Sequence, residues 1–260
     1  MSDTVLVDYG EAGIVTVTLN RPEKLNAFTK SMWGRMGEKL RKLNEDDAVR
    51  CIIIRGAGEK AFSPGNDISE FETDRSTAEQ AEAYGALMHG TIKAFREMRH
   101  PTVAMIHGIC VGGGLELAGL CDIRICGQSS RFGVPISRLG LVMAYQEIEC
   151  LAALCGRQNA LEILLERRVF DAEEAKDKGL VSRIVADDKV EAEAMATAKR
   201  IAEGAPLVHR WHKKFLSRLE DPTRLTQAEV REGFACYDTE DFQIGYRSFL
   251  EKKKPAFKGK

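Results

Sequence analysis

The chain has 260 residues, of which 44% are hydrophobic and 30% are charged, a composition typical of a soluble globular protein with one sizeable core. Its formal net charge of −1 argues against nucleic acid or an anionic membrane surface as a partner. No apolar run is long enough to cross a membrane, and residues 1–13 lack the basic and apolar regions of a signal peptide, so we expect a cytoplasmic protein.

The N-terminal segment alternates between strand and helix patterns. Apolar residues alternate over residues 5–19, which predicts a β-hairpin, and Pro22 ends it because proline cannot continue a central ladder. Thr29 is placed to cap a helix whose apolar positions recur at helical spacing over residues 32–43. Residues 51–54, which are all apolar, predict a strand buried on both faces.

The next segment reads as a loop, a long helix and another strand. Residues 56–67 contain too many turn-forming residues for regular structure. An apolar stripe over residues 76–98 predicts a long helix, which the following His-Pro pair ends. Residues 103–106 then predict a second buried strand.

A glycine triplet follows that strand and opens the next helix. Gly112, Gly113 and Gly114 precede Leu115 and Glu116. Glycines at a helix start leave backbone N–H groups unshielded at the positive end of the helix dipole, where they suit a negatively charged oxygen. The pattern predicts an oxyanion site with a carboxylate beside it. A glycine-rich packing joint with a surface glutamate explains the same residues equally well.

The rest of the chain passes from strands to helices. Strands are predicted at residues 122–126, 131–134 and 180–185, and helices from residue 146 onward, one of them capped by Asp171. The last helices are expected at residues 188–203, 206–219 and 226–250, with a break near Asp238. This order predicts an α/β core in residues 1–203 and a C-terminal helical region in residues 204–260. The latter is too short for a core of its own and should pack on the body or on another subunit.

The cysteines and histidines predict no metal site. The seven cysteines form no CxxC pair, and no histidine cluster accompanies them. Most lie among apolar residues, where a free thiol behaves as a small hydrophobic group. We therefore expect buried thiols, and the alternative of a catalytic cysteine has no supporting motif.

Short motifs distributed over nearly the whole chain occur in a recognisable order. They are Leu19–Pro22 with Asn26-Ala27, Ala61–Ile68, Gly112–Leu117, Cys121-Asp122, Asp171–Ala175 with Gly179–Val181, and Phe249–Pro255. In this order and at these spacings they resemble the enoyl-CoA hydratase/isomerase, or crotonase, superfamily. The resemblance implies an α/β fold, the crotonase-like ββα spiral, with a C-terminal helical oligomerisation region. It also implies a homotrimer or a dimer of trimers, and an acyl-CoA thioester as substrate, so that coenzyme A enters with the substrate and no separate cofactor is needed.

The resemblance also assigns roles to individual residues. The backbone N–H groups of Asn66 and Gly113 would hold the thioester oxygen as it becomes an enolate, and Glu116 would be the principal acid/base. Pro64 would present its carbonyl to the adenine, and Lys24 and Lys252 would meet the phosphates. The full set implied for acyl-CoA binding is Lys24, Leu25, Ala27, Ala61, Pro64, Gly65, Asp67, Ile68, Gly112, Ile136 and Lys252. For Asp67 a capping or bracing role in its loop, and for Lys252 a solvated basic tail, explain the residue without a ligand.

One position departs from the family pattern. Hydratases of the family use a second glutamate after the proline of a Phe-x-x-Pro segment, and here Pro135 is followed by Ile136, which cannot carry a proton. Three interpretations of the proton transfer are compatible with this isoleucine. Glu116 alone moves a proton between two carbons, as in a 3-enoyl-CoA isomerase; Glu147 or Tyr145 supplies the second group; or no second group is needed, as in a malonyl-type acyl-CoA decarboxylase. A first-turn acid favoured by the helix dipole is the non-catalytic reading of Glu147.

Other classes find less support. The sequence holds no G-x-G-x-x-G, no G-x-x-x-x-G-K-[ST] and no G-x-S-x-G motif. The rival from another class is a non-catalytic acyl-CoA-binding protein that kept the fold. Because Glu116 and the glycine triplet are both present, we expect an enzyme acting on a 2-enoyl- or 3-enoyl-CoA. Apolar neighbours such as Ile136 should raise the pKa of Glu116 by desolvation.

Overall fold

The computed structural model describes residues 3–260, so residues 1 and 2, with which the predicted core segment begins, lie outside the described residues. Two sheets form the body of the molecule. The larger has the strand order β1-β2-β3-β5-β7-β9, and only its β1–β2 pair is antiparallel. Its strands are β1 (Val5–Tyr9), β2 (Ile14–Leu19), β3 (Cys51–Gly56), β5 (Thr102–Ile106), β7 (Ile123–Gly127) and β9 (Arg183–Val185). The smaller, parallel sheet contains β4 (Ala61–Ser63), β6 (Ile109–Val111) and β8 (Arg131–Gly133).

The two sheets are built together, turn by turn. After β3, β5 and β7, the chain adds one short strand to the smaller sheet and then enters helical structure before it returns to the larger one. The helices are α1 (Lys30–Glu45), α2 (Phe71–Asp74), α3 (Ala78–Arg96), α4 (Gly113–Gly119), α5 (Tyr145–Glu166), α6 (Ala172–Asp177) and α7 (Val190–Ala202). This strand–strand–helix repeat is the ββα spiral that the motifs predicted, and the prediction of the fold is confirmed.

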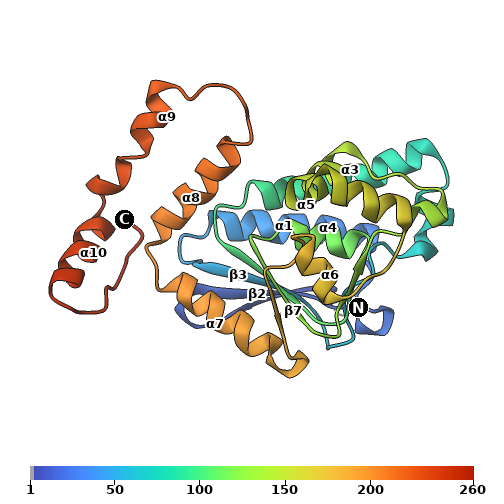
Figure 1. Ribbon diagram of the computed structural model, residues 1–260, viewed down its shortest axis with the longest axis horizontal. Coiled ribbons are helices and arrows are strands. Elements are labelled where there is room, and N and C mark those ends of the chain that lie inside the picture. The colour runs from blue at the N-terminus through green and yellow to red at the C-terminus, as the bar shows by residue number, and fades with distance from the viewer. Residues whose placement is uncertain (1–2) are drawn as a thin grey trace.

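The larger sheet is buried on both faces because its strands are apolar at successive positions. Ile52 and Ile54 belong to the main core beneath α1, α3 and α4, whereas Cys51 and Ile53 belong to a second core with Val190 and other residues of α7. Figure 1 shows α7 on the face of the sheet opposite α1, α3 and α4. The start of α4, where the glycine triplet lies, directly follows β6 of the smaller sheet and packs beside β4, so the smaller sheet positions it.

Several elements match the sequence, and a few differ in an instructive way. Thr29 caps α1 by accepting a hydrogen bond from the amide of Met32, as expected. The segment predicted to be an irregular loop contains β4, and the loop before the glycine triplet contains β6. These two short strands lie among glycines and other turn-forming residues, and they exist because neighbouring segments pair with them. The last strand begins at Arg183 rather than at residue 180.

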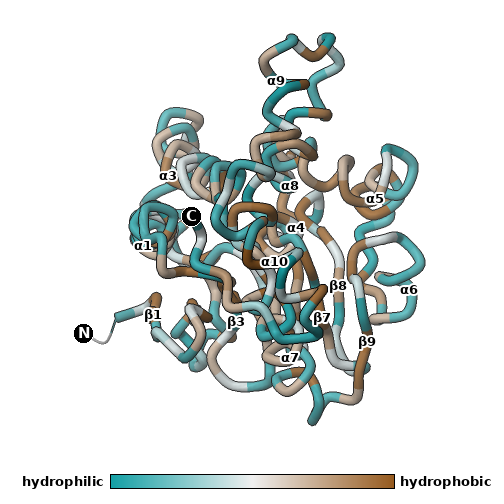
Figure 2. The backbone as a smooth tube through the Cα atoms, turned by 90° about the vertical axis from the view of Figure 1, so that its left-hand side faces the viewer, coloured by the Kyte–Doolittle hydropathy of each residue, from teal (hydrophilic) through white to brown (hydrophobic). Residues whose placement is uncertain are grey.

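The C-terminal region leaves the body as a separate arm of α8 (Pro206–Arg218), α9 (Gln227–Glu232) and α10 (Glu240–Leu250). Figures 1 and 2 show α9 standing clear of the sheets. Within these helices only Pro206 and Asp241 are buried. The predicted break near Asp238 is confirmed by the 3₁₀ turn Ala235–Asp238. The division of the chain at residue 203 stays a prediction.

Two further expectations concern the cysteines and membrane-spanning helices. All seven cysteines are free, and five of them are buried, so the expectation of structural thiols holds for most of them. Within residues 3–260, no helix combines the length and the apolarity that crossing a bilayer requires.

Candidate active site

The loop after β4 and the start of α4 touch through their backbones. A Cβ atom added to Gly65 would lie 2.7 Å from the amide nitrogen of Gly113, and one added to Gly113 would lie 3.8 Å from that of Asn66. Gly65 also has a φ of +98°, which residues with a side chain rarely adopt. Glycine at position 65 allows the two backbone segments to come this close. The two predicted oxyanion amides, those of Asn66 and Gly113, therefore lie near each other.

Both amides are available to a ligand. Gly113 is the first residue of α4, so its N–H group has no acceptor within the helix. The chain around Asn66 is anchored on both sides, because Phe28 N donates to Gly65 O at 2.8 Å and Asp67 N donates to Phe28 O at 2.7 Å. Among residues 3–260, the Asn66 amide itself has no acceptor. The arrangement can therefore bind a negatively charged oxygen.

Aromatic residues that the motifs did not indicate hold Asn66 in place. The indole N–H of Trp33 donates to Asn66 Oδ1 at 2.7 Å, and the Tyr84 hydroxyl donates to the same oxygen at 3.4 Å. Phe28 stacks on Trp33 with 4.1 Å between ring centroids. A buried indole N–H needs an acceptor, but nothing in the sequence shows that the acceptor is this side chain.

The two amides and two carboxylates open onto one cavity. Eight of the predicted residues line it: Pro64, Asn66, Ile68, Gly112, Gly113, Glu116, Ile136 and Glu147. Their neighbours there are mostly apolar and include Phe71, Met88, Leu139, Leu141 and Val142. Glu116 comes from the first turn of α4 and Glu147 from the first turn of α5. Sequence analysis left the position of Glu147 open, and the packing of α5 brings it beside Glu116.

Glu147 is held by two partners. It is only 7% exposed. One oxygen accepts a hydrogen bond from Ala144 N at 2.9 Å, and the other lies 3.2 Å from Nε2 of His89. The first contact is the helix-start role that the sequence suggested, and the second was not foreseen, because His89 lies far away in the sequence on α3.

The surroundings of Glu116 favour its protonated form. Desolvation, reinforced by the negative charge of Glu147 and opposed by Arg75, raises the pKa of Glu116 to about 8. Two carboxyl groups that share a water-poor cavity cannot both ionise easily. At neutral pH the site therefore contains a proton donor, Glu116, next to an anchored carboxyl group.

Other predicted residues lie outside the cavity. Those that do not line it are Lys24, Leu25, Ala27, Ala61, Gly65, Asp67 and Lys252. Asp67 braces its loop, since it accepts from Ser69 N at 3.1 Å and pairs with Arg21 at 3.0 Å. Lys252 follows α10 at the end of the arm. For these residues a contact with coenzyme A stays a prediction. Tyr145 is 92% exposed and does not line the cavity, so it is the wrong candidate for the second proton carrier.

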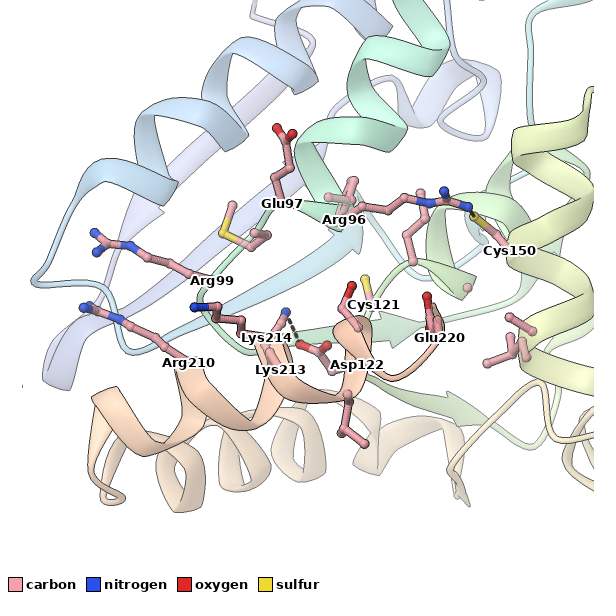
Figure 3. A pocket seen from close by; sticks show the side chains of 18 of the residues that line it. Arg96, Glu97, Arg99, Cys121, Asp122, Cys150, Arg210, Lys213, Lys214 and Glu220 are labelled. Atoms are coloured by element: carbon pink, nitrogen blue, oxygen red, sulfur yellow. Dashed lines mark hydrogen bonds and ion pairs between the residues drawn. The ribbon is translucent and has the colours of Figure 1, made fainter. Parts of the chain in front are cut away.

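A larger hollow lies between the arm and the body, with a volume of about 940 Å³. It shares no residue with the cavity of Glu116. Its charged side chains neutralise one another: Lys213 Nζ lies 2.7 Å from Asp122 Oδ2, as Figure 3 shows, and Arg96 lies 2.6 Å from Glu149. The predicted oxyanion amides and both candidate carboxyl groups line the smaller cavity instead, so that cavity is the candidate active site.

Comparisons with known proteins agree with the geometry. A family model described as enoyl-CoA hydratase/isomerase matches residues 9–260. The short-chain-enoyl-CoA hydratase of Clostridium acetobutylicum is 31% identical over 246 residues, which are 94% of each chain. The 1,2-epoxyphenylacetyl-CoA isomerase of Escherichia coli is 27% identical over 259 residues, 98% of each chain. A crystal structure of an enoyl-CoA hydratase/carnithine racemase from Magnetospirillum magneticum superposes with a TM-score of 0.98 at 47% identity, covering 100% of this chain and 97% of that one. The chain belongs to the enoyl-CoA hydratase/isomerase family.

Proposed function

We propose that this enzyme adds water across the double bond of a 2-enoyl-CoA thioester, with Glu116 and Glu147 as the two proton-transfer groups. The observation that carries the proposal is the shared cavity, in which both carboxyl groups and the two oxyanion amides meet. Ile136 lines the same cavity, so the carboxyl group absent from that position is supplied by α5 instead.

The oxyanion amides would stabilise the enolate. As the nucleophile adds, electrons move from the double bond to the thioester oxygen, which the N–H groups of Asn66 and Gly113 receive as donors. Removal of one such donor typically costs about 100- to 1,000-fold in rate. Trp33, through its hydrogen bond to Asn66 Oδ1, fixes the loop that carries the first donor.

The two glutamates would divide the proton transfers. Glu147 accepts a proton from the attacking water, whose oxygen bonds to C3, and Glu116 gives its proton to C2 of the enolate. The raised pKa of Glu116 and the N–H contact from Ala144 to Glu147 support this division. An acid–base group of this kind typically contributes about 100- to 10,000-fold. The product is a 3-hydroxyacyl-CoA, and both carboxyl groups recover their protonation through exchange with water.

Isomerisation of a 3-enoyl-CoA is the second candidate. The same pair can remove a proton at C2 and return one at C4 through the same enolate. The family model, whose description names isomerases beside hydratases, is compatible with this alternative. A decarboxylase would need neither glutamate as acid or base, and a non-catalytic acyl-CoA-binding protein would need neither for any purpose.

A panel of thioesters tests these candidates. Crotonyl-, 3-hexenoyl- and malonyl-CoA are incubated with the wild type, Glu116→Gln, Glu147→Gln and Glu149→Gln. Hydration and decarboxylation products are identified by mass, and isomerisation, which leaves the mass unchanged, by the absorbance of the conjugated 2-enoyl thioester after chromatography. Glu149 is exposed on the same helix outside the cavity and serves as the matched control. Hydration requires that both cavity variants lose at least about 100-fold in kcat while the control retains activity. Turnover that is unchanged in Glu147→Gln contradicts the two-glutamate mechanism.

We also infer a cytoplasmic homotrimer or dimer of trimers, as the family resemblance implies. The arm supports it, because large apolar side chains are exposed along it: Leu216, Leu219, Phe234, Phe249 and Leu250. A surface of this kind is typical of protein contacts. Sedimentation equilibrium that gives the mass of a single 28.9 kDa chain at micromolar concentration contradicts the oligomer. Lys252, on the same arm, would meet a coenzyme A phosphate either from its own chain or from a neighbouring subunit, as the resemblance implies.

A further inference from the structure

Arg75, at the end of α2, lines the active-site cavity and has no carboxylate partner within residues 3–260. Its guanidinium carbon lies 4.7 Å from the ring centroids of both Phe71 and Tyr84. Nε and Nη1 are buried and have no hydrogen-bond partner among residues 3–260. A guanidinium group carries five N–H donors and stays charged at all physiological pH values. Two aromatic rings therefore orient a cation whose buried donors are unused.

The nearby acidic residues are already committed to other partners. Asp74 pairs with Lys30 Nζ at 2.8 Å. Glu70 accepts a hydrogen bond from Lys30 N at 2.8 Å and one from the Tyr84 hydroxyl at 3.5 Å. Glu116 is influenced by Arg75, whose charge lowers its pKa, but within the described residues no hydrogen bond or ion pair joins the two. The guanidinium is thus free to bind a ligand.

A simple hydrocarbon chain would leave Arg75 unsatisfied. Arg75 is the one cation among the described residues that line the cavity, where Met88, Leu139 and Leu141 supply apolar surface. Filling such a cavity with an alkyl tail removes water from the guanidinium and offers no acceptor in return, which is unfavourable. A carboxylate instead accepts two parallel N–H bonds from a guanidinium.

We propose that Arg75 binds a carboxylate carried by the acyl group, so that the enzyme prefers an enoyl-CoA whose chain ends in a carboxylate. This rests on the proposed function, because the same cavity holds the reacting thioester. This carboxylate is retained in the product. Pairing with Arg75 stabilises the ionised carboxylate of the bound substrate and therefore opposes decarboxylation.

Binding of thioesters without a carbon–carbon double bond, which cannot be hydrated, tests the preference apart from that turnover. Malonyl-, succinyl- and glutaryl-CoA are each compared by calorimetry with the neutral thioester of equal chain length: propionyl-, butyryl- and pentanoyl-CoA. We expect the wild type to bind at least one dicarboxylic member about 10- to 100-fold more tightly than its neutral match, the range of a charge-assisted hydrogen-bonded pair. Equal or weaker binding of all three dicarboxylic thioesters overturns the proposal.

Variants assign the preference to Arg75. Arg75→Met should abolish the preference while retaining affinity for the neutral thioesters, and Arg75→Lys should keep part of it. Arg157→Met is the matched control, because Arg157 is exposed on α5 outside the cavity. If Arg75→Met weakens both thioester types equally, Arg75 acts on the whole site and the proposal is wrong.

Turnover separates this inference from the proposed function. The enoyl counterparts, glutaconyl-CoA and 2-pentenoyl-CoA, are compared in kcat/KM. Preferential binding of dicarboxylic thioesters with no hydration of either substrate supports the role of Arg75 and contradicts the hydratase. Hydration of 2-pentenoyl-CoA that exceeds that of glutaconyl-CoA contradicts the role of Arg75 and leaves the hydratase intact.

Discussion

Replacing Glu116 by glutamine should stabilise the protein at neutral pH while removing its activity. The pKa of the native carboxyl group is about 8, against 4.5 for an ordinary glutamate side chain. Between these two pH values the native state therefore binds one more proton than the unfolded state. The free energy of unfolding then falls as pH rises through this interval. Glutamine has nearly the same shape, remains neutral and escapes the penalty.

The size of the effect follows from the interval. Each pH unit between the two pKa values is worth about 1.4 kcal/mol. The stabilisation by Glu116→Gln should be small at pH 5, on the order of 3 kcal/mol at pH 7, and on the order of 5 kcal/mol at pH 9. The free energy of unfolding of the wild type is thus lower at neutral and alkaline pH because its cavity holds a glutamate that favours the protonated form.

Urea unfolding at pH 5, 7 and 9 measures this difference. The fluorescence of Trp33, whose indole lies beside Asn66, reports on the site, and wild type and variant are compared at one protein concentration so that association affects both alike. Glu149→Gln, outside the cavity, should show no such pH-dependent gain. A difference between wild type and Glu116→Gln that is zero, or the same at all three pH values, refutes the assignment of a raised pKa to Glu116.

Three further changes test the scaffold of the site. Gly114→Ala places a Cβ atom 2.0 Å from Ser63 O and should lower the free energy of unfolding by roughly 3 kcal/mol or more, as measured in thermal melts. Gly90→Ala is the control: this glycine has open space around it on α3, so the variant should be neutral or stabilising in the same measurement. Trp33→Phe loses the bond to Asn66 Oδ1 and should lower kcat by about 5- to 10-fold, and an unchanged kcat would show that the loop needs no such support. His89→Ala removes the partner of Glu147 and should lower kcat several-fold with little effect on KM, whereas a loss confined to KM would place His89 in binding.

The local elements of the fold could be predicted where the sequence repeats a period. Helix α1 follows from its apolar spacing and from Thr29, and β3 follows from residues that are apolar on both faces. The strands β4 and β6 could not be found in this way, because each lies among glycines and other turn-forming residues and forms only when its neighbours are in place. The spiral itself came from the family resemblance and not from any periodicity.

The residues of the candidate site were likewise predictable only in part. The glycine triplet is visible in the sequence from its place at a helix start, whereas the particular role of Gly113 was implied by the family resemblance. No sequence pattern marks Arg75 as a site residue, since it lies between two helices in a polar segment. Its side chain is oriented only by packing against Phe71 and Tyr84. Glu147 is intermediate: its helix-start position was predictable, but its burial depends on how α5 packs against α4.

Ile136 and Glu147 are best understood as one linked change. Both line the cavity of Glu116, and the negative charge of Glu147 already raises the pKa of that residue. A glutamate at position 136 would add a third carboxyl group to the same water-poor space, where like charges oppose one another's ionisation. An apolar residue there adds no such charge and keeps the surroundings of Glu116 poor in water. Under the proposed mechanism, in which α5 supplies the second carboxyl group, isoleucine at position 136 is therefore the residue that suits the cavity.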